Sequence, residues 1–418
     1  MTTPTTTDAK SDTPAMPEID ANARQQHHAW LKQLTSIPTV AGREDRVVAW
    51  VHAWAKDRHD VTVSADACGN LTLRRTEPFA PGEPLYITAH LDHPGFAIDA
   101  IEDETHAVLA FRGGVMEDYF KDARIHCWPA EGDARPGTIL ERIEPEAGDE
   151  EMFKRYRARL DEGHSTQGLT TRDIATWLLP EATITEGLLS TPACDDLAAA
   201  AAALAAFDHL LRAKSAGHAV GRDFRVFFTR AEEIGFVGAI GACRHATIPD
   251  SAPIIALENS RAFDDAPIGG GPIVRVGDRL TVFTPRLTAA VAARAEAISG
   301  GPATPTAAQK QSDMPRWRWQ RKLMAGGACE ATVFCAAGYE ATCVCLPLGN
   351  YHNMADLSAV QAGTNTTEPT IAPEQIATSD FDGLVDLLVA CGQSLNPGGD
   401  IDARLSKLWD DRKFVLEE

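Results

Sequence analysis

The stretch PLYITAHLD, residues 84–92, decides the fold that this sequence predicts. Its nearly continuous apolar run is typical of a strand that is buried on both faces of a sheet. The run ends in His90 and Asp92, two polar side chains at the point where the strand stops. In open sheets built from strands and helices, ligands bind beyond the carboxyl ends of the strands. The stretch therefore predicts both a central strand and one corner of a binding site.

Similar apolar runs recur downstream and alternate with helical segments. Strands are expected in RVFFT (225–229), PIIAL (253–257) and CVCLPL (343–348), and helices at 195–213, 287–299 and 381–395. The helix at 195–213 is rich in alanine, and its small side chains would let it lie close against a sheet. The alternation predicts an α/β fold in which a mixed sheet is covered by helices on both faces.

Between residues 95 and 189 the pattern changes to short alternating runs separated by Gly, Asp and Pro turns. This pattern predicts a small β-rich domain that is inserted into the α/β domain. A short helix is expected at 170–179, because Thr170 and Asp173 have the spacing of a capping box.

The composition fits a folded protein of two to three domains, with 418 residues of which 44% are hydrophobic and 23% charged. Asp and Glu number 59 against 39 Lys and Arg, which gives a formal net charge of -20. Such a charge repels phosphate backbones and anionic lipid, so neither nucleic acid nor a membrane surface is expected as a partner. It favours metal cations or ligands that carry an ammonium group. The segment RWRWQRK (316–322) mixes basic and aromatic residues, but a subunit contact or the rim of a site is its expected role.

The sequence also predicts a cytoplasmic protein. No apolar run approaches the roughly 20 residues that a membrane helix needs. The N-terminus is rich in Thr, Pro and Asp and has neither the basic start nor the apolar core of a signal peptide. The 9 cysteines include no CxxC pair, which favours reduced thiols. Cys343 and Cys345 alternate in one run and are expected as buried core residues rather than as metal ligands.

Polar residues that can bind metal follow four of the predicted strands, and a fifth group opens the alanine-rich helix. They are His90, the pair Glu232 and Glu233, Glu258, His352, and the pair Asp195 and Asp196. Taken singly, each has an ordinary explanation as a helix cap, a solvated strand end, or a loop or core histidine. Together they point to function, because one cleft at the strand ends could collect them all.

Two histidines and three carboxylates can hold two divalent ions if one carboxylate bridges them. The candidate ligands are His90, Asp195, Glu233, Glu258 and His352. Asp195 is the natural bridge, because negative charge is favoured at the start of a helix. Two ions about 3.5–4 Å apart can hold a hydroxide between them and polarise an amide carbonyl. Mixed imidazole and carboxylate ligands suit zinc, with cobalt or manganese as substitutes.

Two further carboxylates have expected roles beside these ions. Asp92, two residues beyond His90, suits an acceptor that fixes the imidazole tautomer. Glu232 faces away from Glu233 along an extended chain, so it could be the base that takes the proton of the water. His93 is a weaker candidate, for which a supporting or surface role is expected. The glycines at 269–271 could bind an anion through their backbone amides, but a tight turn is the expected structure.

These motifs resemble those of the tetrahedral and deblocking aminopeptidases, which are dinuclear metallopeptidases. The likeness extends from about Ala23 to Leu395 and rests on AHLDHPGF (89–96), Asp195-Asp196, RAEEIGFVGA (230–239), Glu258, GGGPIVRVGD (269–278) and PLGNYHN (347–353). The resemblance implies that His90, Asp195 and Glu258 hold one metal, that Asp195, Glu233 and His352 hold the other, and that Glu232 is the general base. It also implies that the insert helps to assemble homo-oligomers and shapes the substrate chamber. Where the family usually has Asp, this chain has Glu258, which is one methylene longer.

The expected division of the chain follows from both lines of reasoning. It comprises a disordered leader at 1–20, a catalytic α/β domain made of 21–94 and 190–397, the inserted β-rich domain at 95–189, and a helical tail at 398–418. The predicted function is that of a dinuclear metal aminopeptidase, whose acidic cleft attracts the free ammonium group of a peptide substrate. Two alternatives stay open. One is an amidohydrolase with the same metal chemistry that acts on N-acyl or carboxy-terminal substrates, and the other is a non-catalytic scaffold, against which an intact Glu232 argues.

Overall fold

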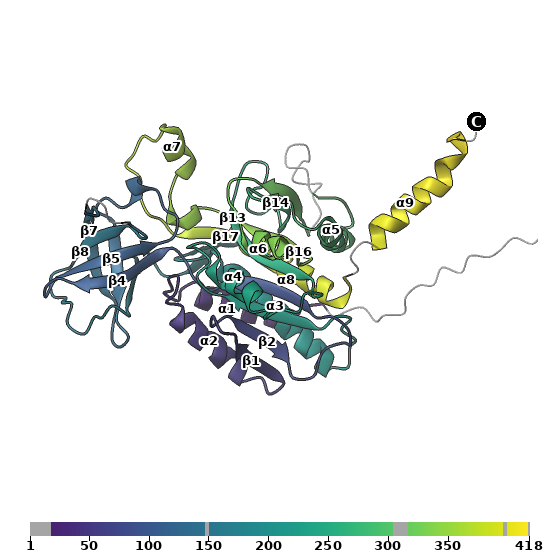
Figure 1. Ribbon diagram of the computed structural model, residues 1–418, viewed down its shortest axis with the longest axis horizontal. Helices are drawn as coiled ribbons and strands as arrows, with labels where there is room; N and C mark the ends of the chain where they lie inside the picture. The colour runs from purple at the N-terminus through teal and green to yellow at the C-terminus, as the bar shows by residue number, and fades with distance from the viewer. Residues whose placement is uncertain (1–17, 147–149, 304–316, 396–398, 417–418) are drawn as a thin grey trace, which may run out of the picture.

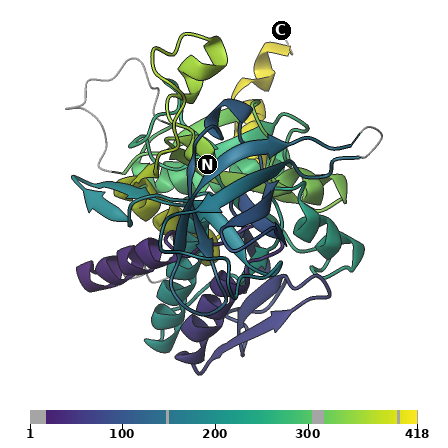
Figure 2. The ribbon, with the colours of Figure 1, turned by 90° about the vertical axis from the view of Figure 1, so that its left-hand side faces the viewer.

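The computed structural model describes residues 18–146, 150–303, 317–395 and 399–416. It contains one large mixed sheet with helices on both faces, a closed β-barrel beside it and a small three-stranded sheet. Figure 1 shows the barrel on the left and the large sheet in the centre, and Figure 2 looks at the molecule with the barrel in front. The leader expected at 1–20 lies almost entirely outside the described residues.

The large sheet has eight strands in the order β1-β2-β12-β3-β13-β16-β14-β15. Their bounds are β1 (Val61–Ala65), β2 (Leu71–Arg75), β3 (Leu85–His90), β12 (Phe224–Thr229), β13 (Ile254–Arg261), β14 (Ile273–Asp278), β15 (Gln320–Met324) and β16 (Ala341–Leu348). The central strands β12, β3, β13 and β16 run parallel. Parallel strands end at the same edge, so the residues that follow these four strands are brought together there.

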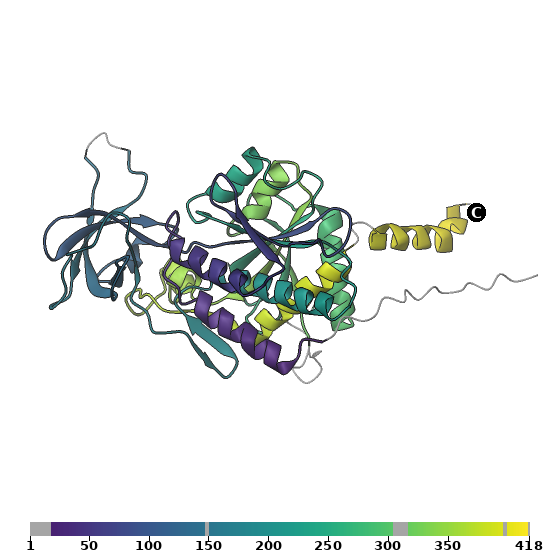
Figure 3. The ribbon, with the colours of Figure 1, turned by 90° about the horizontal axis from the view of Figure 1, so that it is seen from below.

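Helices cover both faces of this sheet, as predicted. One face carries α1 (Ala21–Leu34), α2 (Asp45–Lys56), α3 (Leu197–Ser215), α5 (Pro285–Ser299) and α8 (Thr378–Gln393), and the other carries α4 (Val237–Arg244) and α6 (Glu330–Ala336). Figure 3 shows α1 and α2 in purple, α3 in teal and α8 in yellow across the first face. The alanines 198–203 of α3 are fully buried, and their small side chains let the helix pack closely against the sheet and the neighbouring α8.

The closed barrel consists of six strands in the order β4-β5-β8-β7-β6-β9. They are β4 (Gly95–Ile101), β5 (His106–Arg112), β6 (Arg124–Trp128), β7 (Arg135–Ile143), β8 (Arg155–Leu160) and β9 (Ile174–Trp177). The barrel has its own aromatic core, in which Phe120 and Tyr156 stack with ring centroids 4.3 Å apart and Phe96 packs against Trp177. Closure removes unpaired strand edges, so this small unit is stable beside the large sheet.

The helix predicted at 170–179 is wrong, because Ile174–Trp177 forms β9 and pairs with β4 and β6. The local contact exists: the backbone N–H and the hydroxyl of Thr170 both donate to Asp173 Oδ2, at 2.7 and 3.0 Å. It closes a turn rather than a helix. Pairing on both sides and burial of Trp177 in the barrel core favour the strand more than one local contact favours a helix.

The small sheet joins segments that are far apart in the sequence. It contains β10 (Thr183–Thr185), β11 (Leu188–Thr191) and β17 (Glu374–Ala377), with Thr191 opposite Glu374. An isolated bridge also joins Gly349 to Gln375. The segment before α3 and the loop after β16 are therefore held against the same strand.

The remaining elements are η1 (Glu117–Tyr119), η3 (Tyr351–Asn353), α7 (Leu357–Ala362), α9 (Gly399–Arg412) and η4 (Lys413–Leu416). Cys343 and Cys345 lie buried in β16. Within the described ranges no helix is long and apolar enough to cross a membrane.

Candidate functional site

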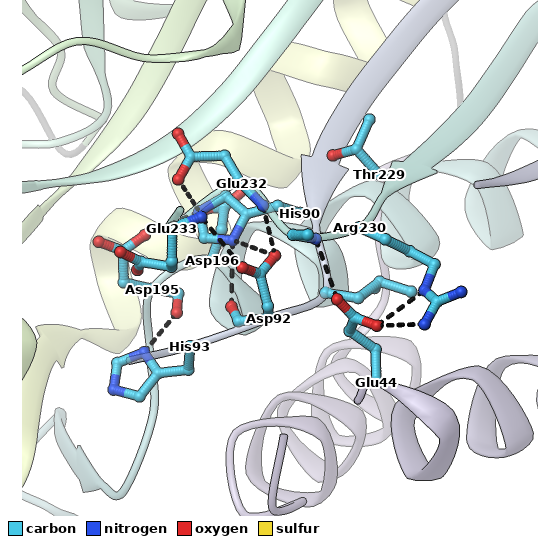
Figure 4. Close-up of polar contacts among 12 residues, drawn as sticks. Glu44, His90, Asp92, His93, Asp195, Asp196, Thr229, Arg230, Glu232 and Glu233 are labelled. Carbon is cyan, nitrogen blue, oxygen red and sulfur yellow. Dashed lines mark hydrogen bonds and ion pairs between the residues drawn. The ribbon is translucent and has the colours of Figure 1, made fainter. Parts of the chain in front are cut away.

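The five side chains predicted as ligands lie together at the carboxyl edge of the central strands (Figure 4 labels three of them). His90 ends β3, Glu233 follows β12, Glu258 lies in β13, His352 lies in η3 after β16, and Asp195 precedes α3. None of these side chains is more than 9% exposed. The parallel register of the strands and the start of α3 thus bring all five predicted residues into one buried cluster.

Asp195 lies between the two histidines. Its Oδ1 is 3.3 Å from His90 Nε2, and its Oδ2 is 3.5 Å from His352 Nε2. Glu258 Oε1 lies 3.9 Å from His90 Nε2, and Glu233 Oε1 lies 3.3 Å from His352 Nε2. Two sets of potential ligands therefore share Asp195, and within each set the candidate atoms lie within 4.8 Å of one another. The sets are His90, Asp195 and Glu258, and Asp195, Glu233 and His352.

Both histidines direct the same ring nitrogen into the cluster. His90 Nδ1 lies 3.0 Å from the backbone oxygen of Asp92, and His352 Nδ1 lies 2.6 Å from that of Gly114. A carbonyl oxygen only accepts, so each Nδ1 carries a proton and donates it. In the neutral ring, each Nε2 then has a lone pair that can bind a cation, which would take the place of a proton there. Gly114 follows β5 of the barrel, so the inserted segment orients His352.

Asp92 contacts His90 mainly through its backbone, and its carboxylate has another partner. Its Oδ1 is 3.5 Å from His90 Nδ1, farther than its backbone oxygen. The carboxylate accepts the backbone N–H groups of Glu232 and Glu233, both at 3.0 Å. Asp92 therefore holds the turn that carries the two glutamates, a contact that the sequence did not indicate.

Glu44, the residue just before α2, supports the same turn, as Figure 4 shows. Its Oε1 accepts the backbone N–H of Ala231 at 2.9 Å, and its Oε2 accepts Arg230 Nε at 2.7 Å. Ala231 has a φ of +54°, in the left-handed region that non-glycine residues rarely adopt. The buried carboxylate of Glu44 thus fixes a bend that turns Glu232 and Glu233 into the cluster. No sequence motif marks Glu44.

His93 and Glu374 connect the loops of Asp195 and His352. His93 Nδ1 is 2.6 Å from the backbone oxygen of Asp195, and its Nε2 is 3.0 Å from Asn353 Oδ1. Glu374 Oε2 accepts the backbone N–H of Asp195 at 3.1 Å, and its Oε1 accepts that of His352 at 2.8 Å. The supporting role expected for His93 matches this position. Glu374 was not predicted, because nothing near it in the sequence has the character of a motif.

The cluster attracts positive charge. Burial raises the pKa of Glu258 well above its ordinary value, and the neighbouring Asp195 raises it further. Burial lowers the pKa of a histidine, but the surrounding carboxylates outweigh it and raise the pKa of His90 and His352 well above the usual value. The buried atoms Asp195 Oδ1 and Glu233 Oε1 have no hydrogen-bond partner among the described residues. Carboxylate oxygens and imidazole nitrogens that converge in this way fit divalent cations, which would satisfy these atoms.

A cavity of about 390 Å³ opens onto the cluster. Its wall includes four of the five predicted ligands, Glu232, residues 259–261 of β13 and residues 114–116 of the inserted segment. Tyr351 stacks on His352 with ring centroids 3.8 Å apart. Arg275, only 2% exposed, also lines the cavity and donates to Ser260 Oγ at 3.2 Å. The sequence indicated neither Tyr351 nor Arg275 as part of the site, although both lie in the motifs quoted above.

The α/β fold and the buried cluster of histidines and carboxylates fit one class of protein, the metal-dependent hydrolases. A family model described as M42 glutamyl aminopeptidase matches residues 69–301, more than half of the chain. The chain therefore belongs to the M42 glutamyl aminopeptidase family, whose members are metallopeptidases, and it is a peptidase. The resemblance and the fold class stated from the sequence are both confirmed. No curated protein sequence matched the chain.

Solved structures share the fold across nearly the whole length. Aminopeptidase APDkam598 from the archaeon Desulfurococcus kamchatkensis is 22% identical with a TM-score of 0.67, over 88% of this chain and 95% of that one. The TET1 peptidase of Pyrococcus horikoshii, which can assemble into a tetrahedron or a large octahedral shell, is 20% identical with a TM-score of 0.64, over 88% and 100%. A TET aminopeptidase from a marine sediment archaeon, Thaumarchaeota archaeon SCGC AB-539-E09, is 19% identical with a TM-score of 0.66, over 89% and 98%.

Proposed function

We propose that this protein is an aminopeptidase that works with two divalent metal ions. His90, Asp195 and Glu258 would hold one ion, and Asp195, Glu233 and His352 the other, with Asp195 shared. The observation that carries the proposal is the position of Asp195, whose two carboxylate oxygens face the Nε2 atoms of two histidines. Zinc suits this set of ligands best, and cobalt or manganese could replace it.

The reaction needs a base as well as ligands. When bound, two divalent ions would polarise the carbonyl of the scissile bond and lower the pKa of the attacking water. Glu232 lines the cavity, and its Oε2 lies 3.9 Å from His90 Nε2. Burial raises the pKa of Glu232 well above its ordinary value, and Glu258 and Glu233 add to the effect. A carboxylate with a raised pKa suits the transfer of a proton from water to the leaving amine. Asp92 and Glu44 would position this base by holding its turn.

Charge explains why the substrate would be the free N-terminus of a peptide. The cavity is lined by the carboxylates of Asp195, Glu232, Glu233 and Glu258, and the whole chain has a net charge of -20. A free ammonium group is attracted to such a site, and an internal peptide bond has no such group. This argument favours an aminopeptidase over a deacylase or a carboxypeptidase with the same metal chemistry.

We further propose that the chain forms a homo-oligomer in the cytoplasm, in which residues 95–189 act as a unit for assembly and for shaping the substrate chamber. The assemblies of the TET1 peptidase support the proposed homo-oligomer. Residues 114–116 form part of the cavity wall, and the backbone oxygen of Gly114 accepts a hydrogen bond from His352 Nδ1. Both observations support a role of residues 95–189 in shaping the substrate chamber. Residues 21–94 and 190–397 would then form the catalytic domain.

The test compares matched peptides that differ only at the N-terminus. The protein is loaded with zinc and assayed with a set of short peptides, each with a free amino group or with an acetylated one. We expect the release of the first residue from the free peptides alone. Cleavage confined to the acetylated peptides would show a deacylase. No cleavage with zinc, cobalt or manganese would favour a non-catalytic scaffold.

Metal content gives a second test that does not depend on activity. Elemental analysis of the zinc-loaded protein after dialysis should give two ions per chain. The double variant H90A/H352A removes one imidazole from each proposed set and should bind neither ion tightly. Wild-type levels of metal in this variant would place the ions elsewhere.

A further inference from the structure

The helix α9 stands clear of the rest of the described chain, at the opposite end of the molecule from the barrel (Figures 1 and 3). It touches α5 near its start, where Arg286 Nη2 lies 3.5 Å from Asp402 Oδ2. Every side chain from Asp402 to Leu416 is exposed. An isolated helix of 14 residues is only marginally stable in water, and most helices in proteins are stabilised by packing one face. The helix therefore needs a partner surface.

One side of α9 is apolar from Leu405 to Trp409, and Arg412 follows on the same side at the end of the helix. Leu408 and Trp409 lie three and four residues after Leu405, so the three side chains lie on the same face. They are 59%, 47% and 58% exposed, and Phe414, Val415 and Leu416 in η4 are at least 55% exposed. Six large apolar side chains within twelve residues form an exposed apolar patch of the kind that marks an interaction site.

The charged residues beside this patch indicate which partner it fits. Arg404 and Asp411 are seven residues apart, or two helical turns, so they lie along the same flank of the apolar face. Asp411 Oδ2 also lies 3.1 Å from Lys407 Nζ of its own helix, an exposed pair that is weak and easily exchanged. Consider two copies of α9 that run antiparallel about a two-fold axis between residues 407 and 408. Arg404 of each copy then lies opposite Asp411 of the other, and Leu405 lies beside Leu408. A parallel pair would instead bring both arginines to one end and both aspartates to the other.

We propose that α9 is a self-association helix that pairs antiparallel with α9 of a second copy of this chain. A standard stable interface buries about 800 Å² on each partner, and two helices of this length bury less. The pairing of two α9 helices would therefore strengthen an assembly whose copies are already held together by other contacts. In such an assembly the effective concentration of one α9 around another is high. This interface lies far from the barrel and from the cavity. The proposal rests on the proposed homo-oligomer and goes beyond the proposed activity, because catalysis does not require it.

Photo-crosslinking of the full-length chain tests the geometry directly. Leu408 is replaced by p-benzoylphenylalanine, the protein is irradiated, and the crosslinked peptides are mapped by mass spectrometry. We expect a covalent dimer in which residue 408 is joined to residues 404–411 of a second chain. Crosslinks to the body of the same or of another chain, or none at all, would overturn the proposal.

Charge reversal tests the antiparallel arrangement. In this crosslinking background, R404D or D411R alone places like charges at both symmetry-related contacts, and the yield of crosslinked dimer should fall roughly tenfold. The double variant R404D/D411R and an equimolar mixture of the two single variants restore opposite charges and should recover the wild-type yield. The matched control D410R reverses a charge away from the apolar face and should change little. Loss without recovery in the double variant and the mixture, or equal loss in D410R, would contradict antiparallel pairing.

Discussion

The carboxylate of Asp92 accepts the backbone N–H groups of Glu232 and Glu233, each at 3.0 Å. The backbone oxygen of Asp92 lies 3.0 Å from His90 Nδ1. One residue after β3 thus orients a proposed metal ligand through its main chain and the proposed base through its side chain. The positions of His90 and of the turn after β12 are coupled through Asp92.

Asn in place of Asp92 should weaken catalysis without unfolding the protein. The amide has the same shape, but its NH₂ group would face one of the two backbone N–H groups and leave it without an acceptor. We expect kcat/KM to fall about 10- to 100-fold, as for other groups that support a metal centre. The control is D99N, at an exposed carboxylate on β4 of the barrel. Wild-type kcat/KM in D92N would show that the turn does not depend on this carboxylate.

The change of Glu232 to Gln should abolish most of the activity and leave the metal in place. The side chain keeps its shape but can no longer take a proton, so kcat should fall about 10²- to 10⁴-fold. Metal content and the circular dichroism spectrum are measured beside kcat. E104Q, at an exposed residue in the turn between β4 and β5, is the control. If E232Q kept its full kcat, another group would have to be the base.

Removal of His352 alone should affect one proposed ion more than the other. His352 belongs to only one of the two sets, so H352A should retain about one metal ion per chain and lose activity. A chelator should remove both ions from the wild type and lower its melting temperature, because ions that bind only the folded state stabilise it. Elemental analysis and thermal unfolding measure these effects. Two tightly bound ions in H352A would contradict the assignment of this ligand.

The pH dependence of stability should reveal a buried histidine outside the site. His27 of α1 is fully buried, and neither ring nitrogen has a hydrogen-bond partner among the described residues. Burial lowers the pKa of His27 from 6.5 to about 4. The folded state therefore disfavours its protonated form. The contribution of neutral His27 to the free energy of unfolding is fully present above pH 6.5. It is lost as the pH falls toward 4, which lowers the free energy of unfolding by up to about 3 kcal/mol.

The variant H27L removes this titration and should show a smaller loss of stability on acidification. The free energy of unfolding in urea is measured at pH 7 and pH 4.5 on metal-free protein, so that metal release does not contribute. H59L, at an exposed histidine, is the control and should behave as the wild type does. An identical pH dependence in H27L and the wild type would show that His27 is not protonated on unfolding.

The sequence by itself was enough for the architecture and for the members of the cluster. The apolar runs that end in His90, Glu232–Glu233, Glu258 and His352 are strands buried on both faces, and such strands lie parallel with their ends at one edge. Periodicity and polarity are local properties, so they can be read along the chain without knowledge of distant contacts. Where a distant contact decided the local structure, the prediction failed, as for Ile174–Trp177, which the barrel turns into a strand.

Only the tertiary structure decided how the cluster is held. His352 donates to Gly114 across 238 residues, His93 meets Asn353 across 260, and Glu374 binds the backbone of Asp195 across 179. Such hydrogen bonds depend on distances and angles between segments that no spacing in the sequence reports. Among the residues that the structure describes, none covers the apolar face of α9. Its amphipathic pattern indicates a helix, but only the position of that helix outside the folded body shows that its apolar face is still free to bind.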